Sequence, residues 1–148
     1  MSVLEGKRGE QKLNVLIAAI KLMEYILTIT NNERTFKPVY QAVTTDIIHC
    51  AERIYIYLYT ANEIYRNEKN IELRRQYQTK ANAECNVLLA LMDLAQGLNH
   101  FPSKKIMHVN ALINGSVEED GRKRKGLKTL IQNWKASDTR ELNKKKNR

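Results

Sequence analysis

The sequence predicts an all-α fold, an up-down-up-down four-helix bundle whose fourth helix is interrupted by an insert. Only 2 prolines and 6 glycines occur in 148 residues, so residues that break helices are scarce. Apolar residues recur at three- and four-residue intervals along most of the chain. Short links join the long amphipathic segments, which makes neighbouring helices antiparallel. With 43% hydrophobic residues, a chain of this length forms one domain with a core.

The first predicted helix runs from about Glu10 to Thr30 and ends at Asn31-Asn32. Its apolar residues form one stripe at helical spacing, which is typical of an amphipathic helix. The stripe comprises Leu13, Leu16, Ile17, Ile20, Met23 and Leu27.

The second predicted helix begins near Pro38, a residue that suits the first helical position. Residues 54–59, Ile-Tyr-Ile-Tyr-Leu-Tyr, alternate and taken alone resemble a strand, but the helical spacing continues through them from both sides. We therefore predict helix. Its tyrosines cannot share a face, so some point outward or into a subunit contact. The predicted oligomer interface is Tyr55, Tyr57 and Tyr59, and the predicted inward face is Val43, Ile47, Cys50, Ile54, Leu58 and Ala61.

The third helix is predicted to start after Asn70, a plausible N-cap, and to reach about Leu98. Its inward residues are predicted to be Leu73, Tyr77, Ala81, Leu88, Met92, Ala95 and Leu98. Ser103 can cap a fourth helix that carries Ile106, Val109, Leu112 and Ile113 and stops at Asn114-Gly115.

A charged insert at 116–126 and a closing helical piece follow the fourth helix. The insert divides into an acidic EED and a basic RKRK stretch. The closing piece carries Leu127, Leu130, Ile131 and Trp134. We therefore expect a bundle domain over residues 1–138 and a basic disordered tail over 139–148.

Positive charge is concentrated at the end of the chain. Residues 1–102 carry 12 Lys and Arg against 11 Asp and Glu, whereas residues 103–148 carry 13 against 5. Such clustered cations make a polyanion the first partner to consider. The N-terminal residues lack the apolar stretch of a secretory signal, and no apolar run approaches the roughly 20 residues of a membrane span. We expect a cytoplasmic protein without a membrane partner.

Catalytic and metal-binding patterns are missing from the sequence. It contains no phosphate-binding glycine loop and no H-E-x-x-H. Asp46 and His49 have the spacing of half a di-iron site, but no second such pair exists, and His100 and His108 lack metal-ligand spacing. Cys50 and Cys85 are best explained as two buried thiols in a reducing compartment. We expect no enzyme activity, no metal and no cofactor.

The candidate RNA-binding residues fall into three groups. The first lies on the third helix, where a solvated helix face is an equally good explanation, and comprises Arg74, Arg75 and Lys80. The second flanks the apolar positions of the fourth segment and comprises Lys104, Lys105, Lys128 and Lys135. The third is the basic run of the insert, Arg122, Lys123, Arg124 and Lys125. Phe and Trp are scarce, so we expect contacts that follow the RNA backbone rather than read bases.

Three blocks of sequence resemble the accessory variability determinant (Avd) family of diversity-generating retroelements. They are SVLEGKRGEQKLNVLIAAIKLMEYILTITNNE near the start, LRRQYQTKANAECNVLLALMDLA on the third helix and LIQNWKASD near the end. The resemblance covers about residues 2–138. The insert departs from the family pattern, in which the fourth helix runs on without a break.

The resemblance implies a function that the composition does not. Avd proteins are bacterial or phage-encoded, and they assemble as positively charged homopentameric barrels of four-helix bundles. They bind the element's reverse transcriptase and its template-repeat RNA, alone or as an RNA/cDNA hybrid. With these partners they support the error-prone cDNA synthesis of mutagenic retrohoming and perform no chemistry themselves.

Two alternatives belong to other classes. One is a structural bundle that binds ribosomal RNA or another protein, as relatives encoded in ribosomal-RNA intervening sequences do. The other is a helical redox or metal protein, which bound iron or zinc would reveal.

Overall fold

The chain is helical along most of its length, as the sequence predicts. A computed structural model describes the backbone of residues 3–146 and the side chains of residues 11–145. Within that range lie a 3-10 helix and two short strands besides the α-helices, in the order α1 (Val3–Thr30), η1 (Pro38–Tyr40), α2 (Gln41–Glu63), α3 (Ile71–Asn99), α4 (Lys104–Asn114), β1 (Ser116–Val117), β2 (Lys123–Arg124) and α5 (Leu127–Lys146). The predicted all-α class is confirmed.

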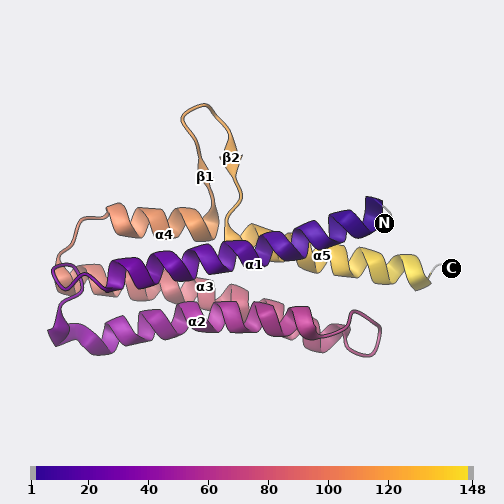
Figure 1. The fold of residues 1–148 in the computed structure, drawn as a ribbon, viewed down its shortest axis with the longest axis horizontal. Coiled ribbons are helices and arrows are strands. Elements are labelled where there is room, and N and C mark those ends of the chain that lie inside the picture. Colours follow the sequence, from indigo (N-terminus) through magenta and orange to yellow (C-terminus); the bar gives the residue numbers. More distant parts are fainter. Residues whose placement is uncertain (1–2, 147–148) are drawn as a thin grey trace.

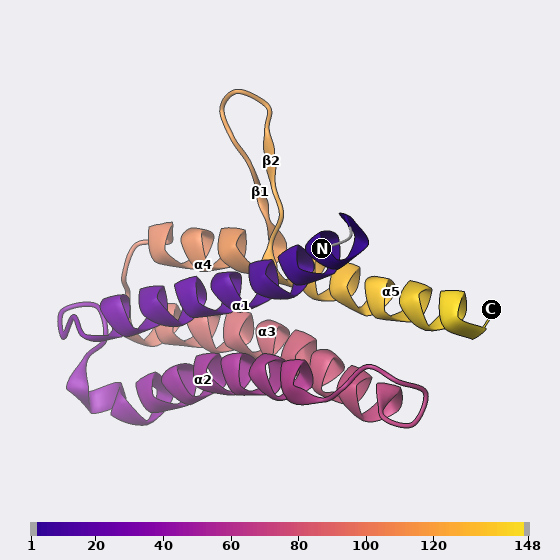
Figure 2. The same cartoon turned by 45° about the vertical axis from the view of Figure 1, so that its right-hand side comes forward.

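Helices α1, α2 and α3 run along the length of the molecule, and α4 and α5 follow one another along the same edge (Figure 1). Helix α2 packs on α1 and α3, while both α4 and α5 contact α1 and α3. The start of α1 and the end of α5 lie at the same end of the molecule (Figure 2). The hairpin formed by β1 and β2 leaves the body between α4 and α5.

Helix α1 buries a different face from the stripe that the sequence indicates. Its core residues are Val15, Ala19, Leu22, Ile26 and Ile29. Four residues of the predicted stripe lie outward, with exposed fractions of 55% for Leu13, 40% for Ile17, 40% for Ile20 and 46% for Leu27. The other two, Leu16 and Met23, are half-buried against the core. Apolar residues occur on nearly every side of this helix, so their spacing cannot determine which side is buried.

The segment Gln11–Thr30 of α1 is long and apolar enough to cross a membrane by length and composition alone. The sequence-based expectation that no apolar run approaches the length of a membrane span is therefore wrong when hydropathy is averaged over the segment. The charged residues Lys21 and Glu24 lie within this segment. Part of the segment is buried inside the molecule.

The predicted core of α2 is confirmed, and that of α3 is confirmed in part. Residues 54–59, which resemble a strand, are helical. On α3 the prediction fails at Leu73, which is 48% exposed, while the polar residues Arg74 and Gln78 are buried. They turn inward because their partner, Asp138, is buried on α5.

The predicted starts of α3 and α4 are correct, but the capping side chains act differently. Helix α1 begins at Val3 rather than near Glu10, and Pro38 begins the 3-10 helix that precedes α2. Asn70 and Ser103 precede α3 and α4, and neither side chain caps the helix that follows. Ser103 Oγ instead accepts a hydrogen bond from Gln96 Nε2 at 3.0 Å. Gly115 ends α4 as predicted, with a φ of 94° that favours glycine.

The insert is an ordered β-hairpin that projects from the helices in both views (Figures 1 and 2). Its strands pair antiparallel, with Ser116 opposite Arg124 and Val117 opposite Lys123. The turn closes through a hydrogen bond from Gly121 N to Glu118 O at 2.9 Å.

The predicted disordered tail is helical as far as the structure describes it. Helix α5 continues to Lys146, and residues 147–148 lie outside the described part of the chain. Leu142 is buried at 8% exposure, so the segment after residue 138 still contributes an apolar contact. That contact explains why the helix continues where charge alone predicts disorder.

Candidate nucleic-acid interface

Two lysines of α5 reach across to α3 with matching spacing. Lys128 Nζ donates to Asn86 Oδ1 at 2.8 Å, and Lys135 Nζ donates to Thr79 Oγ1 at 3.0 Å. The two lysines are seven residues apart on α5, and their two acceptors are seven residues apart on α3. Seven residues are about two helical turns, or about 10.5 Å. The two lysines therefore lie on one line along the α3–α5 contact.

A third cation extends this line toward the end of the molecule where α3 begins. Arg75 Nη2 donates to Thr139 Oγ1 of α5 at 2.8 Å, and its Nη1 donates to Glu72 Oε1 at 3.1 Å. We call Arg75, Lys128 and Lys135, with the polar residues that they contact across the two helices, the α3–α5 seam. Both lysines have neutral partners, so their charges are not compensated within the described residues.

A buried acceptor lies beside the seam. Asn82 Oδ1 has no hydrogen-bond partner although it is shielded from solvent. It borders a shallow hollow of about 450 Å³ that Lys128 and Gln132 also line. The hollow thus places one cation, Lys128, among polar side chains of α3, α4 and α5.

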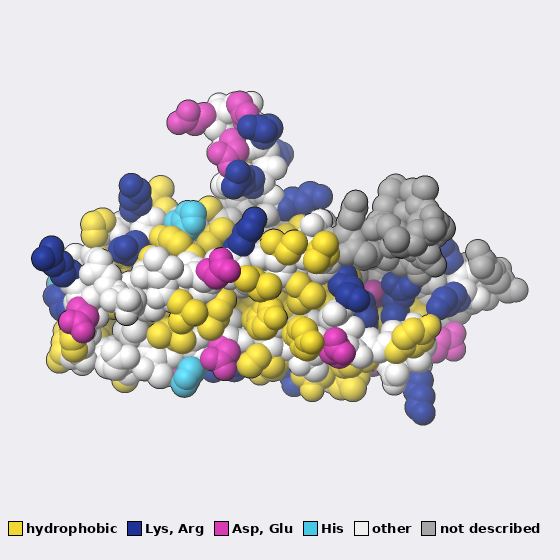
Figure 3. Space-filling model, viewed as in Figure 1, with side chains coloured by type: hydrophobic (Ala, Val, Ile, Leu, Met, Phe, Trp, Pro, Cys, Tyr) yellow, Lys and Arg dark blue, Asp and Glu magenta, His cyan; other side chains and the backbone are white. Residues whose placement is uncertain are grey.

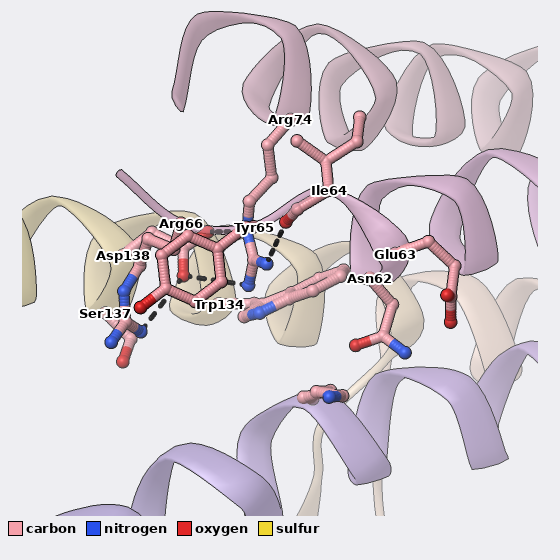
Figure 4. Close-up of a pocket in the computed structure, with 10 residues that line it drawn as sticks. Asn62, Glu63, Ile64, Tyr65, Arg66, Arg74, Trp134, Ser137 and Asp138 are labelled. Atoms are coloured by element: carbon pink, nitrogen blue, oxygen red, sulfur yellow. Dashed lines mark hydrogen bonds and ion pairs between the residues drawn. The ribbon is translucent and has the colours of Figure 1, made fainter. Parts of the chain in front are cut away.

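A buried polar network fixes α5 against α3 and so positions the seam. Arg74 Nε and Nη2 donate to the two oxygens of Asp138 at 2.7 and 3.1 Å (Figure 4). Arg74 Nη1 donates to Ile64 O at 2.9 Å, and Gln78 Nε2 donates to Asp138 at 3.0 Å. The guanidinium also lies 4.9 Å from the centre of the Trp134 ring.

This network removes Arg74 from the candidate RNA-binding surface. Its side chain is 8% exposed and that of Asp138 is 2% exposed. A guanidinium that is enclosed and already bonded to a carboxylate has no donor to offer to a phosphate. Arg74 has a structural role here.

The remaining helix cations lie away from the seam. Lys80 is exposed on the side of α3 that faces α2, where its Nζ lies 5.9 Å from the Tyr57 ring centre and 5.3 Å from that of Tyr77. Lys104 and Lys105 stand at the start of α4, at the end of the molecule opposite α5 (Figure 1). The structure therefore brings together three of the seven predicted helix cations.

The basic run of the insert is partly neutralised by the acidic run that precedes it. Arg122 pairs with Asp120 at 2.6 Å, and Arg124 pairs with Glu118 at 2.9 Å. The hairpin folds the two runs onto each other, a pairing that the sequence does not reveal. Lys123 and Lys125 are exposed, and no ion pair of the described residues involves them.

The three candidate interface tyrosines are divided between two sides of α2. The Tyr55 and Tyr59 rings lie 6.1 Å apart, while Tyr57 lies 6.1 Å from Tyr77 of α3. Tyr59 is 49% exposed, and the other two are half-buried. They do not form one continuous surface.

The cysteines are buried and unpaired, as predicted. Burial raises the pKa of Cys50 to about 12, helped by its hydrogen bond to the Glu84 carboxylate at 3.1 Å. Burial likewise raises the pKa of Cys85 to about 12. Both thiols remain protonated at neutral pH, so neither is a ready nucleophile.

The histidines do not gather into a metal site. No group of three His, Cys, Asp or Glu side chains suited to a metal occurs among the described residues. His49, His100 and His108 are exposed, and the His108 ring lies 4.2 Å from that of Tyr25.

Comparison with known proteins adds no family: no family model, curated protein or solved structure matches this chain. The seam and the sequence blocks are therefore the features of this chain that bear on its function. Two of those blocks meet in space, since Arg74 belongs to the LRRQYQTK segment and Asp138 ends LIQNWKASD.

Proposed function

We propose that this chain is a non-catalytic accessory protein of a diversity-generating retroelement. It binds the element's reverse transcriptase and template-repeat RNA and supports error-prone cDNA synthesis. The α3–α5 seam is the observation that carries RNA binding, because its lysines contact neutral partners and keep their full charge. The polymerase partner rests on the resemblance of the three sequence blocks to the Avd family.

The finer architecture belongs to the same proposal. Helices α4 and α5 are the two halves of the fourth helix of an antiparallel four-helix bundle, and the hairpin is inserted between them. Five copies assemble into a ring that repeats the seam and strengthens its positive potential. The outward stripe of α1 supports a subunit contact there, because Leu13, Ile20 and Leu27 expose apolar surface at helical spacing.

The seam suits an RNA backbone better than a base-specific site. Its donors are the ends of lysine and arginine side chains, interleaved with amide and hydroxyl groups. Contacts of this kind position a phosphate chain but carry little sequence information. Aromatic platforms for stacking bases are not part of the seam.

A paired substitution tests the RNA contact. In Lys128→Gln/Lys135→Gln, binding to the template-repeat RNA should weaken about thirtyfold, at about 1 kcal/mol for each of the two lost phosphate contacts. The matched control Arg34→Gln/Lys37→Gln removes two cations from the loop between α1 and α2 and should bind as the wild type does. Filter binding at fixed salt measures both.

Association with the reverse transcriptase is tested by co-purification of the two proteins. If the protein neither binds the template-repeat RNA nor associates with the polymerase, the proposed function is wrong. Equal affinity for the template-repeat RNA and for a ribosomal-RNA fragment would favour the structural bundle instead.

Light scattering tests the assembly. The wild type should form an oligomer at micromolar concentration, and Leu13→Lys/Leu27→Lys should dissociate it by placing charge on the outward stripe of α1. A monomeric wild type would contradict the subunit contact.

A further inference from the structure

The projecting hairpin forms one wall of a groove on the body of the protein. The groove measures about 540 Å³ and lies between α1, α4, the base of the hairpin and the first turns of α5. Its apolar lining, which we call the floor, comprises Ile17, Ala18, Ala111, Leu112 and Leu130, and the uncharged polar or histidine side chains of Asn14, His108 and Ser116 also line it. We call this feature the hairpin groove.

The hairpin wall of the groove has a defined position because the base of the hairpin packs closely against the end of α4 and the start of α5. A Cβ on Gly115 would lie 2.6 Å from Arg124 O, and one on Gly126 would collide with the backbone of residues 113–115. Alternate residues of a strand share a face, and Ser116 lies opposite Arg124, so Ser116, Glu118 and Arg124 form the face that lines the groove.

The rim of the hairpin groove is basic. Lys21 of α1 and Arg124 and Lys125 of the hairpin line it together with one acid, Glu118. Glu118 is already paired with Arg124 at 2.9 Å. No ion pair of the described residues involves Lys21 or Lys125, so the rim retains two uncompensated positive charges.

An apolar floor beneath a basic rim favours a protein ligand over a nucleic acid. Ile17 is 40% exposed, and apolar surface of this kind is stabilised by covering it with other apolar groups. A phosphate backbone offers none. Figure 3 shows hydrophobic side chains over the body below the hairpin and basic side chains at the hairpin's base.

We propose that the hairpin groove docks an acidic amphipathic segment of a partner protein. Its apolar side packs on Ile17, Leu112 and Leu130, and its carboxylates meet Lys21 and Lys125 across the rim. Recognition of an amphipathic segment by a groove combines buried apolar anchors with complementary charge at the edge. The proposal does not depend on RNA binding by the seam.

A designed peptide tests the chemistry of the groove. The probe is a fluorescein-labelled amphipathic peptide with leucines on one face and glutamates on the other, and its partner control carries lysines in place of the glutamates. Fluorescence anisotropy should show the acidic peptide binding at least tenfold more tightly than the basic one. Lys21→Glu/Lys125→Glu should invert this preference, whereas Lys37→Glu/Lys69→Glu, in the α1–α2 and α2–α3 loops, should not.

The apolar floor has its own variant. Ile17→Asp should weaken binding of the acidic peptide at least tenfold while circular dichroism shows unchanged helicity. Equal binding of both peptides, or an unaltered preference after charge reversal, would refute the proposal. A third result would also refute the proposal: the wild-type protein is an oligomer that binds no peptide, and Ile17→Asp dissociates this oligomer. In that case a second copy of the chain occupies the groove. None of these measurements contains RNA, so their failure leaves the proposed function standing.

Discussion

Asp138 connects three parts of the chain through one buried carboxylate. It accepts hydrogen bonds from Arg74 and Gln78 of α3, and Arg66 of the loop before α3 approaches it to 3.6 Å. A buried charge is tolerated when its partners satisfy it, and leaving one partner alone in the interior is costly. The network therefore holds α5 in the position that forms the seam.

Asp138→Ala should destabilise the fold by about 3–5 kcal/mol, because it leaves the Arg74 guanidinium buried without its anion. Chemical denaturation measures the loss. The control Asp120→Ala breaks an exposed pair with Arg122 and should cost less than about 1 kcal/mol. Equal losses in the two variants would show that the buried network does not stabilise the fold.

Glu84 gives the fold a dependence on pH. Burial raises the pKa of Glu84. Hydrogen bonds from Cys50 and Arg53, together with the charge of Arg53, lower it by more than burial raises it, so the net pKa lies below the ordinary value of 4.5. A carboxyl group with a lowered pKa stabilises the folded state above its unfolded pKa, and this stabilisation is lost as pH falls through the folded value.

Glu84→Gln should therefore reduce stability at pH 7 by about 0.5–1 kcal/mol, a small value because Arg53 is partly exposed. The gap between wild type and variant should close as pH falls below 4.5. Urea denaturation at pH 7 and pH 3.5 measures the gap. A gap that widens in acid would mean that the assigned sign is wrong.

Residue positions were predictable where local spacing decides them. The inward face of α2 follows from a single apolar stripe. On α3, by contrast, Leu73 is exposed and Arg74 is buried, because the partner of Arg74 lies 64 residues further along the chain. The contacts of Thr79 and Asn86 could not be predicted from the sequence either, because their partners also lie far along the chain, on α5. Only the seven-residue spacing of Lys128 and Lys135 signals the seam in advance.

At the scale of elements, the glycines at the base of the hairpin determine how it leaves the body. Gly126→Ala should destabilise the protein by about 1–3 kcal/mol, because the added Cβ meets the backbone of the preceding turn. The control Gly97→Ala adds a Cβ into open space within α3 and should stabilise by up to about 1 kcal/mol. Thermal melts compare them, and a neutral Gly126→Ala would contradict the tight packing.

The helices themselves were the most predictable elements, and the insert was the least. Apolar spacing located the α-helices of the described residues, although α1 begins before the predicted Glu10 and α5 continues past residue 138 into the predicted tail. The charged stretch of eleven residues gave no strand signal. One ion pair, Glu118–Arg124, joins the two sides of the hairpin, a second, Asp120–Arg122, lies within its turn, and Gly115 and Gly126 allow its base to pack closely. In α1, the apolar residues on nearly every side left the buried face undetermined.

At the scale of the whole molecule, the positive charge of the C-terminal third lies on surfaces with different chemistry, and Lys21 of α1 and Arg75 of α3 add to it. The seam carries cations with neutral partners, the hairpin carries cations half paired with acids, and Lys21 and Lys125 border an apolar groove. The charge count alone predicted a polyanion partner, and the tertiary register between α3 and α5 shows where uncompensated cations line up.

The salt dependence of RNA binding distinguishes a phosphate contact at the α3–α5 seam from one elsewhere on the protein. Each phosphate contact adds about 0.7 to the slope of log affinity against log salt for a single strand, because counterions are released. Lys128→Gln/Lys135→Gln should therefore flatten the slope by about 1.4, and Arg34→Gln/Lys37→Gln should leave it unchanged. Identical slopes for the seam variant and the wild type would show that RNA does not bind at the α3–α5 seam.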